Sequence, residues 1–475
     1  MAELRQGALS QNSVGLAGAV AQSAAFIAPA VGVTAGNIFV AGLSGIAAPF
    51  EFVIGLVICL CIASAIGAFA GQISSAGSFY TYLNAALGPQ VGFVAGIALF
   101  GAYICVLVFT FAFYGGFISS FAATYGVHAP WQIWTAGLGL IVTGVGVLGL
   151  RPSIRVALLG LILETAIFAA LTLVILSEGG AHGLSVQPFS PARSATGTSG
   201  VFLGSVYTIF AFVGFESATT LGEEARSPKR TIPRAVMLTT LAIGIFYVFV
   251  TYAEVIGFGL NRAGLHELQT NLSPFTSLAN RYIGGWMGPV VAAATISSLT
   301  ALCIAQITAG SRVLFALGRD RMAPRWLGHA SHKGVPALSI LAISTVGVGA
   351  GLIGGSAWGA VSFASWSSFL GTLFFIGAYA LLAVGVTFFA RKRSGMSFHP
   401  VRHAAIPLLG FAGIMLVLYG NVHPLPPSPL RYLIWSAIAI AALATAFVIR
   451  LSQRDPERVR AAGRILGTGE ARDPV

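Results

Sequence analysis

Long apolar runs recur along the whole of this 475-residue chain. A run of about 20 apolar residues matches the hydrocarbon core of a bilayer, which is about 30 Å thick. Hydrophobic residues make up 56% of the sequence and charged residues only 8%, whereas a soluble domain carries about 25% charged residues. A soluble fold of this length would leave too much apolar surface in water. The chain is therefore predicted to be an all-α membrane protein.

The lengths of the runs and the breaks between them predict twelve transmembrane helices. The first run is too long for the apolar part of a signal peptide, so no cleavable signal is expected. The predicted spans are 14–35, 42–69, 91–121, 131–150, 153–177, 201–221, 234–257, 287–315, 337–355, 359–390, 404–421 and 431–450.

The basic residues lie almost entirely on one side of the predicted bilayer. Twelve spans place both termini on the same side, and that side receives 22 of the 26 Lys and Arg residues. Because positively charged loops stay in the cytoplasm, we expect both termini to be cytoplasmic and the protein to lie in the plasma (inner) membrane. The net charge of +12 thus reflects topology and predicts no nucleic-acid partner.

Two of the predicted spans contain an interruption. The first reads Ser-Ala-Ala-Phe-Ile-Ala-Pro at residues 23–29, where Pro29 removes a backbone donor. The sixth reads Phe-Val-Gly-Phe-Glu at residues 212–216, with Gly214 at its centre. Pro29 lies about 16 residues into its span and Gly214 about 14 residues into its own, five spans later. The breaks therefore occupy corresponding positions in two five-helix halves.

Paired breaks in corresponding spans predict a transport site at the interface between the two halves. Unwound backbone is tolerated at membrane depth only where it lines a cavity or binds a ligand. Free N–H groups suit a carboxylate and free C=O groups suit an ammonium group, so the two breaks together suit an amino acid. A proline kink and an unrelated glycine packing contact are the alternative. The candidate substrate-binding residues are Ser23, Ala25, Phe26, Ile27, Ala28, Phe210, Ala211, Phe212 and Gly214.

Three motifs occur in order along the chain. Residues 76–82 read Ala-Gly-Ser-Phe-Tyr-Thr-Tyr, and residues 210–216 are followed by Glu-Glu-Ala-Arg-Ser-Pro at 223–228 and Ile-Pro-Arg-Ala at 232–235. Ser311 and Arg312 precede Gly-Arg-Asp-Arg-Met-Ala-Pro at 318–324. Together these motifs resemble those of the amino acid–polyamine–organocation permeases, and the resemblance extends over about residues 10–450.

The resemblance implies the fold of the bacterial leucine transporter, with a 5+5 inverted repeat, discontinuous helices 1 and 6, and two peripheral helices. It also implies alternating access and an aromatic lid over the substrate, at Phe210 or Phe212. The corresponding division of the chain is a cytoplasmic N-terminal segment 1–13, a first repeat 14–177, a second repeat 201–390, helices 11 and 12 at 404–450, and a cytoplasmic basic tail 451–475.

Four carboxylates lie within predicted spans, where a charged side chain is costly and a function is the default hypothesis. Glu164 lies near the middle of the fifth span, and because burial disfavours the charged form of a carboxyl group, it is a candidate for proton coupling. A neutral or hydrogen-bonded carboxyl group that only packs against its neighbours is the alternative. The resemblance places Glu164 near the ion site of sodium-driven members. Ser297, Ser298 and Thr300 in the eighth span are candidates for bonding an ion or their own helix backbone, and the second use is the commoner one.

Glu216 is the second proton-coupling candidate. It follows the break in the sixth span, so we expect it at the N-terminus of a second half-helix, where the helix dipole favours an anion. A purely structural role, tying spans together by hydrogen bonds, is the alternative. Glu254, near the end of the seventh span, is expected to reach the membrane interface, and Glu51 has no assigned role.

These observations predict a secondary active transporter of amino acids or related amines. Proton symport is the preferred mode, sodium coupling and substrate exchange are alternatives, and a channel or a transporter-like receptor is a further class. No phosphate-binding loop and no zinc-protease motif is present, so an enzyme is not expected. The four cysteines lie within apolar runs, so neither a metal nor another cofactor is expected. The sequence leaves the substrate and the oligomeric state open.

Overall fold

The computed structural model describes residues 9, 11–194, 197–271, 273–331, 333–392, 397–423, 425–426 and 428–461. Most of the predicted N-terminal segment 1–13, and residues 462–475 of the predicted tail, lie outside the described residues. Within these ranges the elements are helical, apart from one isolated β-bridge between Val14 and Ala225.

The α-helices and the shorter 3-10 or π segments (η) follow one another as α1 (Leu16–Ile27), α2 (Pro29–Val31), η2 (Gly32–Gly36), α3 (Asn37–Ser44), η3 (Gly45–Ala47), α4 (Ala48–Ala70), α5 (Phe79–Leu87), α6 (Pro89–Ala123), α7 (Trp131–Leu148), α8 (Leu150–Ser177), η4 (Gln187–Phe189), η5 (Pro191–Arg193), α9 (Thr198–Phe212), η6 (Ser217–Leu221), α10 (Pro228–Phe258), α11 (Arg262–Thr270), α12 (Pro274–Tyr282), α13 (Met287–Arg319), η7 (Arg325–Gly328), α14 (Ala337–Trp358), α15 (Ala360–Lys392), η8 (Val401–Ala405), α16 (Ile406–Val422), α17 (Leu430–Arg454) and α18 (Pro456–Ala461).

Ten helical segments in the described ranges are long and apolar enough to cross a membrane. One of them, Leu16–Ala70, takes in the first two predicted spans. The predicted sixth span corresponds to α9, which at 15 residues is too short for that count. The prediction of a multi-pass all-helical membrane protein is therefore confirmed, while the number of twelve spans and the inverted repeat stay predictions.

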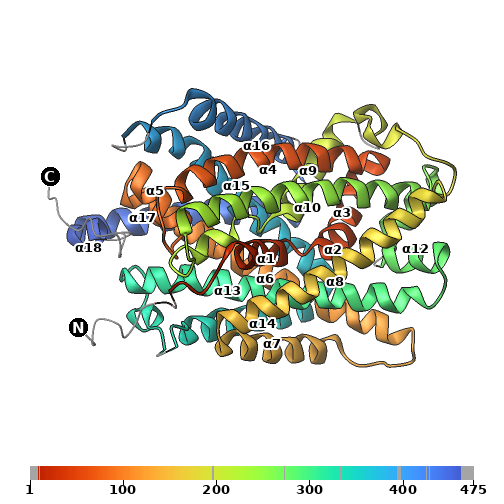
Figure 1. Cartoon of the computed structure of the whole chain (residues 1–475), viewed down its shortest axis with the longest axis horizontal. Helices are drawn as coiled ribbons and strands as arrows, with labels where there is room; N and C mark the ends of the chain where they lie inside the picture. Colours follow the sequence, from red (N-terminus) through yellow and green to blue (C-terminus); the bar gives the residue numbers. More distant parts are fainter. Residues whose placement is uncertain are drawn as a thin grey trace.

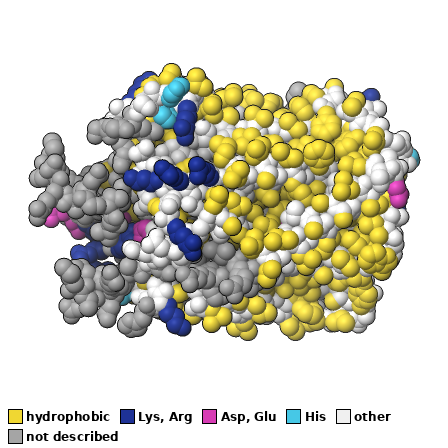
Figure 2. Space-filling model, viewed as in Figure 1, with side chains coloured by type: hydrophobic (Ala, Val, Ile, Leu, Met, Phe, Trp, Pro, Cys, Tyr) yellow, Lys and Arg dark blue, Asp and Glu magenta, His cyan; other side chains and the backbone are white. Residues whose placement is uncertain are grey.

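The long helices run roughly along one axis of the molecule, and both termini lie at the same end (Figure 1). We call this the terminal end and its counterpart the opposite end. Apolar side chains cover most of the visible surface, whereas Lys and Arg side chains gather toward the terminal end (Figure 2). Several large apolar side chains on the surface are more than two thirds exposed, among them Leu140 at 78% and Ile353 at 74%. Such a surface suits lipid and not water.

Candidate functional site

The first transmembrane segment is interrupted where the sequence predicts. Helix α1 ends at Ile27, Ala28 adopts a left-handed conformation with φ of 52°, and a new helix starts at Pro29. Directly beyond it the chain widens into the π-helical segment η2 before α3 begins. The break at Pro29 is confirmed, and the π-helical turn after it was not predicted. The interruption exposes main-chain groups of residues 27–30 to partners on other helices.

The second break lies at the end of α9. This helix stops at Phe212, and Gly214 has a φ of 114°, a conformation that side-chain-bearing residues rarely adopt. The expected second half-helix after Glu216 is instead the short 3-10 segment η6. Thr219 and Thr220 each donate a hydroxyl hydrogen bond to the carbonyl three residues earlier, at 2.6 and 2.7 Å, and these bonds accompany the tighter turns of η6.

The two breaks are in direct contact with each other. A Cβ atom at Gly214 would lie 2.3 Å from Cδ1 of Phe26 and 2.8 Å from its carbonyl carbon, so only glycine permits this approach. Ser23 joins the same segments, since its hydroxyl donates to the carbonyl of Phe215 at 2.9 Å and accepts from the N–H of Ala218 at 3.1 Å. Segments about 190 residues apart in the sequence thus form one site, and Ser23 serves to join them.

Tyr247 on α10 links the carbonyl ends of both broken helices. Its hydroxyl donates to the carbonyl of Ala211 at 2.9 Å and lies 3.4 Å from the carbonyl oxygen of Ile27. Sequence reasoning missed this residue. A tyrosine in the middle of an apolar span was the available signal, because a buried phenol hydroxyl needs a hydrogen-bond partner. Two of the carbonyls predicted to be free are therefore held by this side chain.

The aromatic candidates differ in what they face. The ring of Phe26 packs against Tyr103 with centroids 5.1 Å apart, and Phe210 meets Phe109 edge-on at 5.0 Å. Phe212 is fully buried and packs against Tyr247 at 5.3 Å. Phe210 keeps 9% of its surface exposed, so it is better placed than Phe212 for a lid. Ala25, Ile27, Ala28 and Ala211 are all buried beside the breaks.

Glu216 is held by hydrogen bonds from three directions. Its Oε1 accepts from the hydroxyl of Tyr103 at 3.3 Å, and its Oε2 accepts from the hydroxyl of Tyr379 at 2.9 Å and from the N–H of Gly214 at 3.0 Å. The two tyrosines come from α6 and α15. This geometry matches the structural alternative, in which Glu216 ties spans together. Its part in proton coupling stays a prediction.

Glu164 lies beside the break in the first segment. Its carboxyl group, on α8, is 1% exposed and faces the backbone N–H of Ala30 and the hydroxyl of Ser298. Its Oε2 has no hydrogen-bond partner among the described residues. It also interacts electrostatically with Tyr247. Glu164 therefore contacts the site and keeps an oxygen available for a proton.

The structure corrects the expectation for Glu254 and locates Glu51. Glu254 does not reach the interface, because it is completely buried and accepts a hydrogen bond from the side chain of Asn37. The reason is that the loop helix α11 packs against both α10 and α3, and Asn37 of α3 bonds directly to the carboxyl group. Glu51 is also completely buried, and its carboxyl group fills the space left by the missing side chain of Gly204 on α9.

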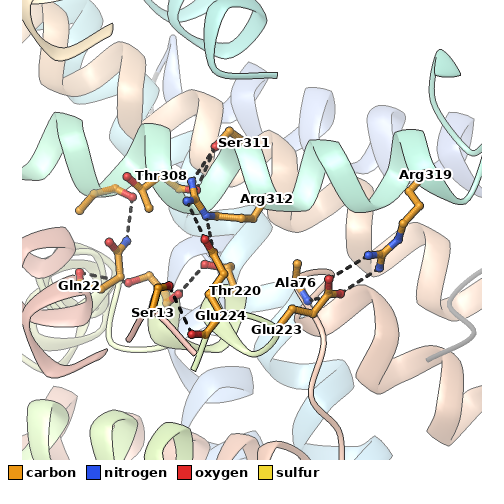
Figure 3. Close-up of polar contacts among 12 residues, drawn as sticks. Ser13, Gln22, Ala76, Thr220, Glu223, Glu224, Thr308, Ser311, Arg312 and Arg319 are labelled. Atoms are coloured by element: carbon orange, nitrogen blue, oxygen red, sulfur yellow. Dashed lines mark hydrogen bonds and ion pairs between the residues drawn. The ribbon is translucent and has the colours of Figure 1, made fainter. Parts of the chain in front are cut away.

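A buried ion pair joins α13 to the segment that follows η6 (Figure 3). Arg312 on α13 donates from Nε to Glu224 at 2.9 Å and from a terminal nitrogen at 3.3 Å. The arginine side chain is 3% exposed and the glutamate 0%. The main chain joins a further segment to this pair, because the N–H groups of Ser13 and Val14 donate to the carbonyl of Glu224.

A second ion pair lies beside the first. Arg319 donates two hydrogen bonds of 2.9 Å to Glu223, which also accepts from the N–H of Ala76 at 3.0 Å (Figure 3). Tyr80 donates to Asp320 at 2.8 Å. Residues from all three sequence motifs therefore meet at the terminal end. The motifs that carry the family resemblance build one polar network, which lies between the helix breaks and that end.

An all-helical bundle with apolar membrane-length helices and two contacting helix breaks agrees with the architecture of a permease. The family model described as amino acid permease matches residues 19–449. The chain therefore belongs to the amino acid permease family, and the predicted resemblance is confirmed. Permeases are transporters, not enzymes.

Individual relatives are distant from this chain. It is 24% identical to the branched-chain amino acid permease BcaP of Lactococcus lactis, over 78% of this chain and 81% of that protein. It is 31% identical to an uncharacterised transporter of Mycobacterium tuberculosis, over 63% of this chain and 66% of that protein. It is 25% identical to the low-affinity putrescine importer PlaP of Escherichia coli, over 65% of this chain and 67% of that protein.

Proposed function

We propose that the protein is a proton-coupled secondary transporter of amino acids with apolar side chains. The observation that carries this proposal is the direct contact between the two helix breaks, with Glu164 beside one of them. Unwound backbone at membrane depth offers N–H and C=O groups to a carboxylate and an ammonium group. We propose a binding site in the plasma membrane made of Ser23, Ala25, Phe26, Ile27, Ala28, Phe210, Ala211, Phe212 and Gly214.

The lining favours an amino acid over a polyamine. Phe26 and Phe210 supply apolar rings, which suit an aliphatic side chain. A diamine such as putrescine carries two positive charges and needs carboxylates directed at it. Of the two acids at the breaks, Glu216 already accepts hydrogen bonds from the protein with both oxygens, and Glu164 has one oxygen, Oε2, without a partner in the described residues. The name of the branched-chain permease of Lactococcus lactis agrees with this choice.

Alternating access requires that the two ends of the bundle open in turn. The ion pairs of Arg312 and Arg319 hold the terminal end closed, so we propose that transport breaks them when substrate is released there. The gathering of Lys and Arg side chains at this end (Figure 2) supports a cytoplasmic location for it. In this proposal, residues 14–177 and 201–390 are the two five-helix repeats, and residues 404–450 form the two peripheral helices.

The proposal is tested by replacing Glu164 with glutamine in protein reconstituted into liposomes. We expect wild-type protein to accumulate labelled leucine when an inward proton gradient is applied. Glu164→Gln removes the group that binds the proton but keeps its shape, so accumulation should fall to the level without a gradient. Leucine exchange between the two sides should remain. The measurement is uptake with and without the gradient, repeated with a sodium gradient and with labelled putrescine.

The matched control is Glu178→Gln, which changes an exposed acid at the end of the same helix. It should transport like the wild type. If wild-type protein transports neither leucine nor putrescine, the transport proposal is wrong. If leucine exchanges across the membrane but never accumulates with any gradient, the protein is an exchanger. Unchanged proton dependence in Glu164→Gln would remove Glu164 as the coupling residue.

A further inference from the structure

Glu254 and Asn37 form a buried polar pair that the proposed transport mechanism does not use. Both side chains are completely buried, and the Asn37 amide donates to Oε2 of Glu254. Neither Oε1 of Glu254 nor Oδ1 of Asn37 has a hydrogen-bond partner within the part of the chain that the structure describes. Two buried oxygens without a donor, one of them on a carboxyl group, are what a site for a proton would present.

The surroundings of Glu254 contain no cation directed at its carboxyl group among the described residues. Of the charged groups on helices packed against this end of α10, Arg281 of α12 is paired with Glu267 of α11 and donates to the carbonyl of Gly257. Tyr282 donates to the same carbonyl. A charged Glu254 would therefore be an uncompensated buried charge, whereas a protonated one is stable.

The acids on the remaining neighbours of α10 have other environments. Glu164 on α8 faces the break, and Glu216 before η6 is held by two tyrosines. Glu51 on α4 also has carboxyl oxygens without a hydrogen-bond partner in the described ranges, but they lie against Gly204 of α9. A carboxylic acid at Glu254 can donate its proton to Oδ1 of Asn37 once the amide is turned over, because the two ends of an amide are assigned from their partners and not observed directly. The pair can thus stabilise a protonated Glu254 without a third side chain.

Glu254 lies on the route from the opposite end of the bundle to Glu164. Helices α8 and α10 run in the same direction here, since Glu164 on α8 interacts with Tyr247 on α10, and further along both helices the N–H of Ala181, just after α8, donates to the carbonyl of Ile256 in the last turn of α10. Glu164 interacts with Tyr247, which precedes Glu254 by seven residues on α10. Seven helical residues span about 10 Å, and Glu254 is about one turn from the end of α10 at Phe258.

Two buried hydroxyl groups lie on the segments between these acids. Thr34 is in η2, between Ala30 beside Glu164 and Asn37. Thr172 is on α8, two turns beyond Glu164. Like the pair itself, both hydroxyl oxygens are buried and without a hydrogen-bond partner in the described ranges. Hydroxyl groups both donate and accept, so these side chains can pass a proton between acids, directly or through water.

We propose that Glu254 and Asn37 form a second proton-binding site, which takes a proton at the opposite end and passes it to Glu164. The inference rests on the proposed proton coupling. The transfer is a proton exchange between two carboxyl groups, in which Glu254 is deprotonated as Glu164 is protonated, and no other bond changes. In the proposed orientation the opposite end faces the outside, where the proton concentration is higher during uptake.

The test uses the full-length protein with Glu254→Gln, which has the shape of the protonated acid. In liposomes, leucine accumulation driven by a proton gradient should fall to the level without a gradient, while leucine exchange stays at the wild-type level. Infrared difference spectra of the purified protein between two pH values should lose the carbonyl band of one carboxylic acid. In Asn37→Ala the same band should titrate at a different pH.

Glu51→Gln is the matched control, because Glu51 is a buried acid near the same end that faces α9 and not this route. It should keep the gradient dependence of the wild type. The inference is wrong if wild-type uptake depends on the gradient and Glu254→Gln keeps that dependence, if this variant also loses exchange, or if its infrared spectrum is unchanged. A wild type without gradient dependence overturns the proposed coupling, and the infrared spectra then decide separately whether Glu254 binds a proton.

Discussion

Replacing Arg312 by methionine is expected to lower the free energy of unfolding by about 3–5 kcal/mol. The physical reason is that Glu224, with 0% of its side chain exposed, would be left charged and unpaired at the centre of the terminal-end network. Methionine fills similar space but offers no donors to the glutamate, to the carbonyl of Thr308 or to the hydroxyl of Ser311. Thermal unfolding of the purified variant in detergent measures the loss.

The control for this substitution is Arg281→Met. Its partner Glu267 lies in an ion pair whose two side chains are both 42% exposed, and such pairs contribute about 0–1 kcal/mol. The double variant Arg312→Met with Glu224→Gln should recover part of the lost stability, because the second change removes the stranded charge. Equal losses in Arg312→Met and Arg281→Met would contradict the assignment of Arg312 as the buried anchor of the closure.

Gly214→Ala is expected to abolish most transport and to lower the free energy of unfolding by about 2–5 kcal/mol. Two causes act together. The backbone at this position has a φ of 114°, which a residue with a Cβ atom adopts only with strain. The added atom would also lie within 3 Å of the ring and the carbonyl carbon of Phe26. Leucine exchange in liposomes and thermal unfolding of the same preparation measure the two effects.

Gly137→Ala is the matched control for this change. Gly137 lies within α7, and a Cβ atom there would meet nothing within 4 Å. Alanine favours a helix over glycine by about 0.5–1 kcal/mol, so this variant should be as stable as the wild type or more so and should transport normally. Gly214→Ala combined with Phe26→Ala should remove the collision with the ring, but neither the collision with the carbonyl carbon of residue 26 nor the backbone strain. Normal transport by Gly214→Ala alone would contradict the role given to the contact between the breaks.

The positions of both helix breaks could be predicted because their causes are local. Pro29 lacks a backbone donor and Gly214 accepts a conformation that other residues rarely adopt, so each residue gives a local signal for an interruption. The apolar surface and the basic end of the molecule follow from composition and charge in the same way. Glu164 was identified because an acid in an apolar run stands out, and the structure places it beside the break.

Partners on distant helices could not be predicted. The hydroxyl of Tyr247 contacts the carbonyls of Ala211 and Ile27, which are 36 and 220 residues away in the sequence. The residues around Tyr247 do not indicate which carbonyls elsewhere in the chain lack a helical partner. Glu254 was predicted to reach the interface because the sequence places it near the end of a span. The residues that bury it, on α3 and α11, lie elsewhere in the chain and could not be matched to it from the sequence. The 3-10 form of η6 depends on local threonine hydroxyls, a weaker signal than proline or glycine.

The hydrogen bonds that join the segment before α1 to the segment after η6 have a consequence for how this family can diverge. The N–H groups of Ser13 and Val14 donate to the carbonyl of Glu224, and the N–H of Arg226 donates to the carbonyl of Val14. These bonds involve only peptide groups, which every residue except proline supplies in full. The part of the closure that consists of these backbone hydrogen bonds therefore does not depend on side-chain identity. Relatives in which the charged residues of this network are replaced can therefore retain the same backbone hydrogen bonds between the two segments.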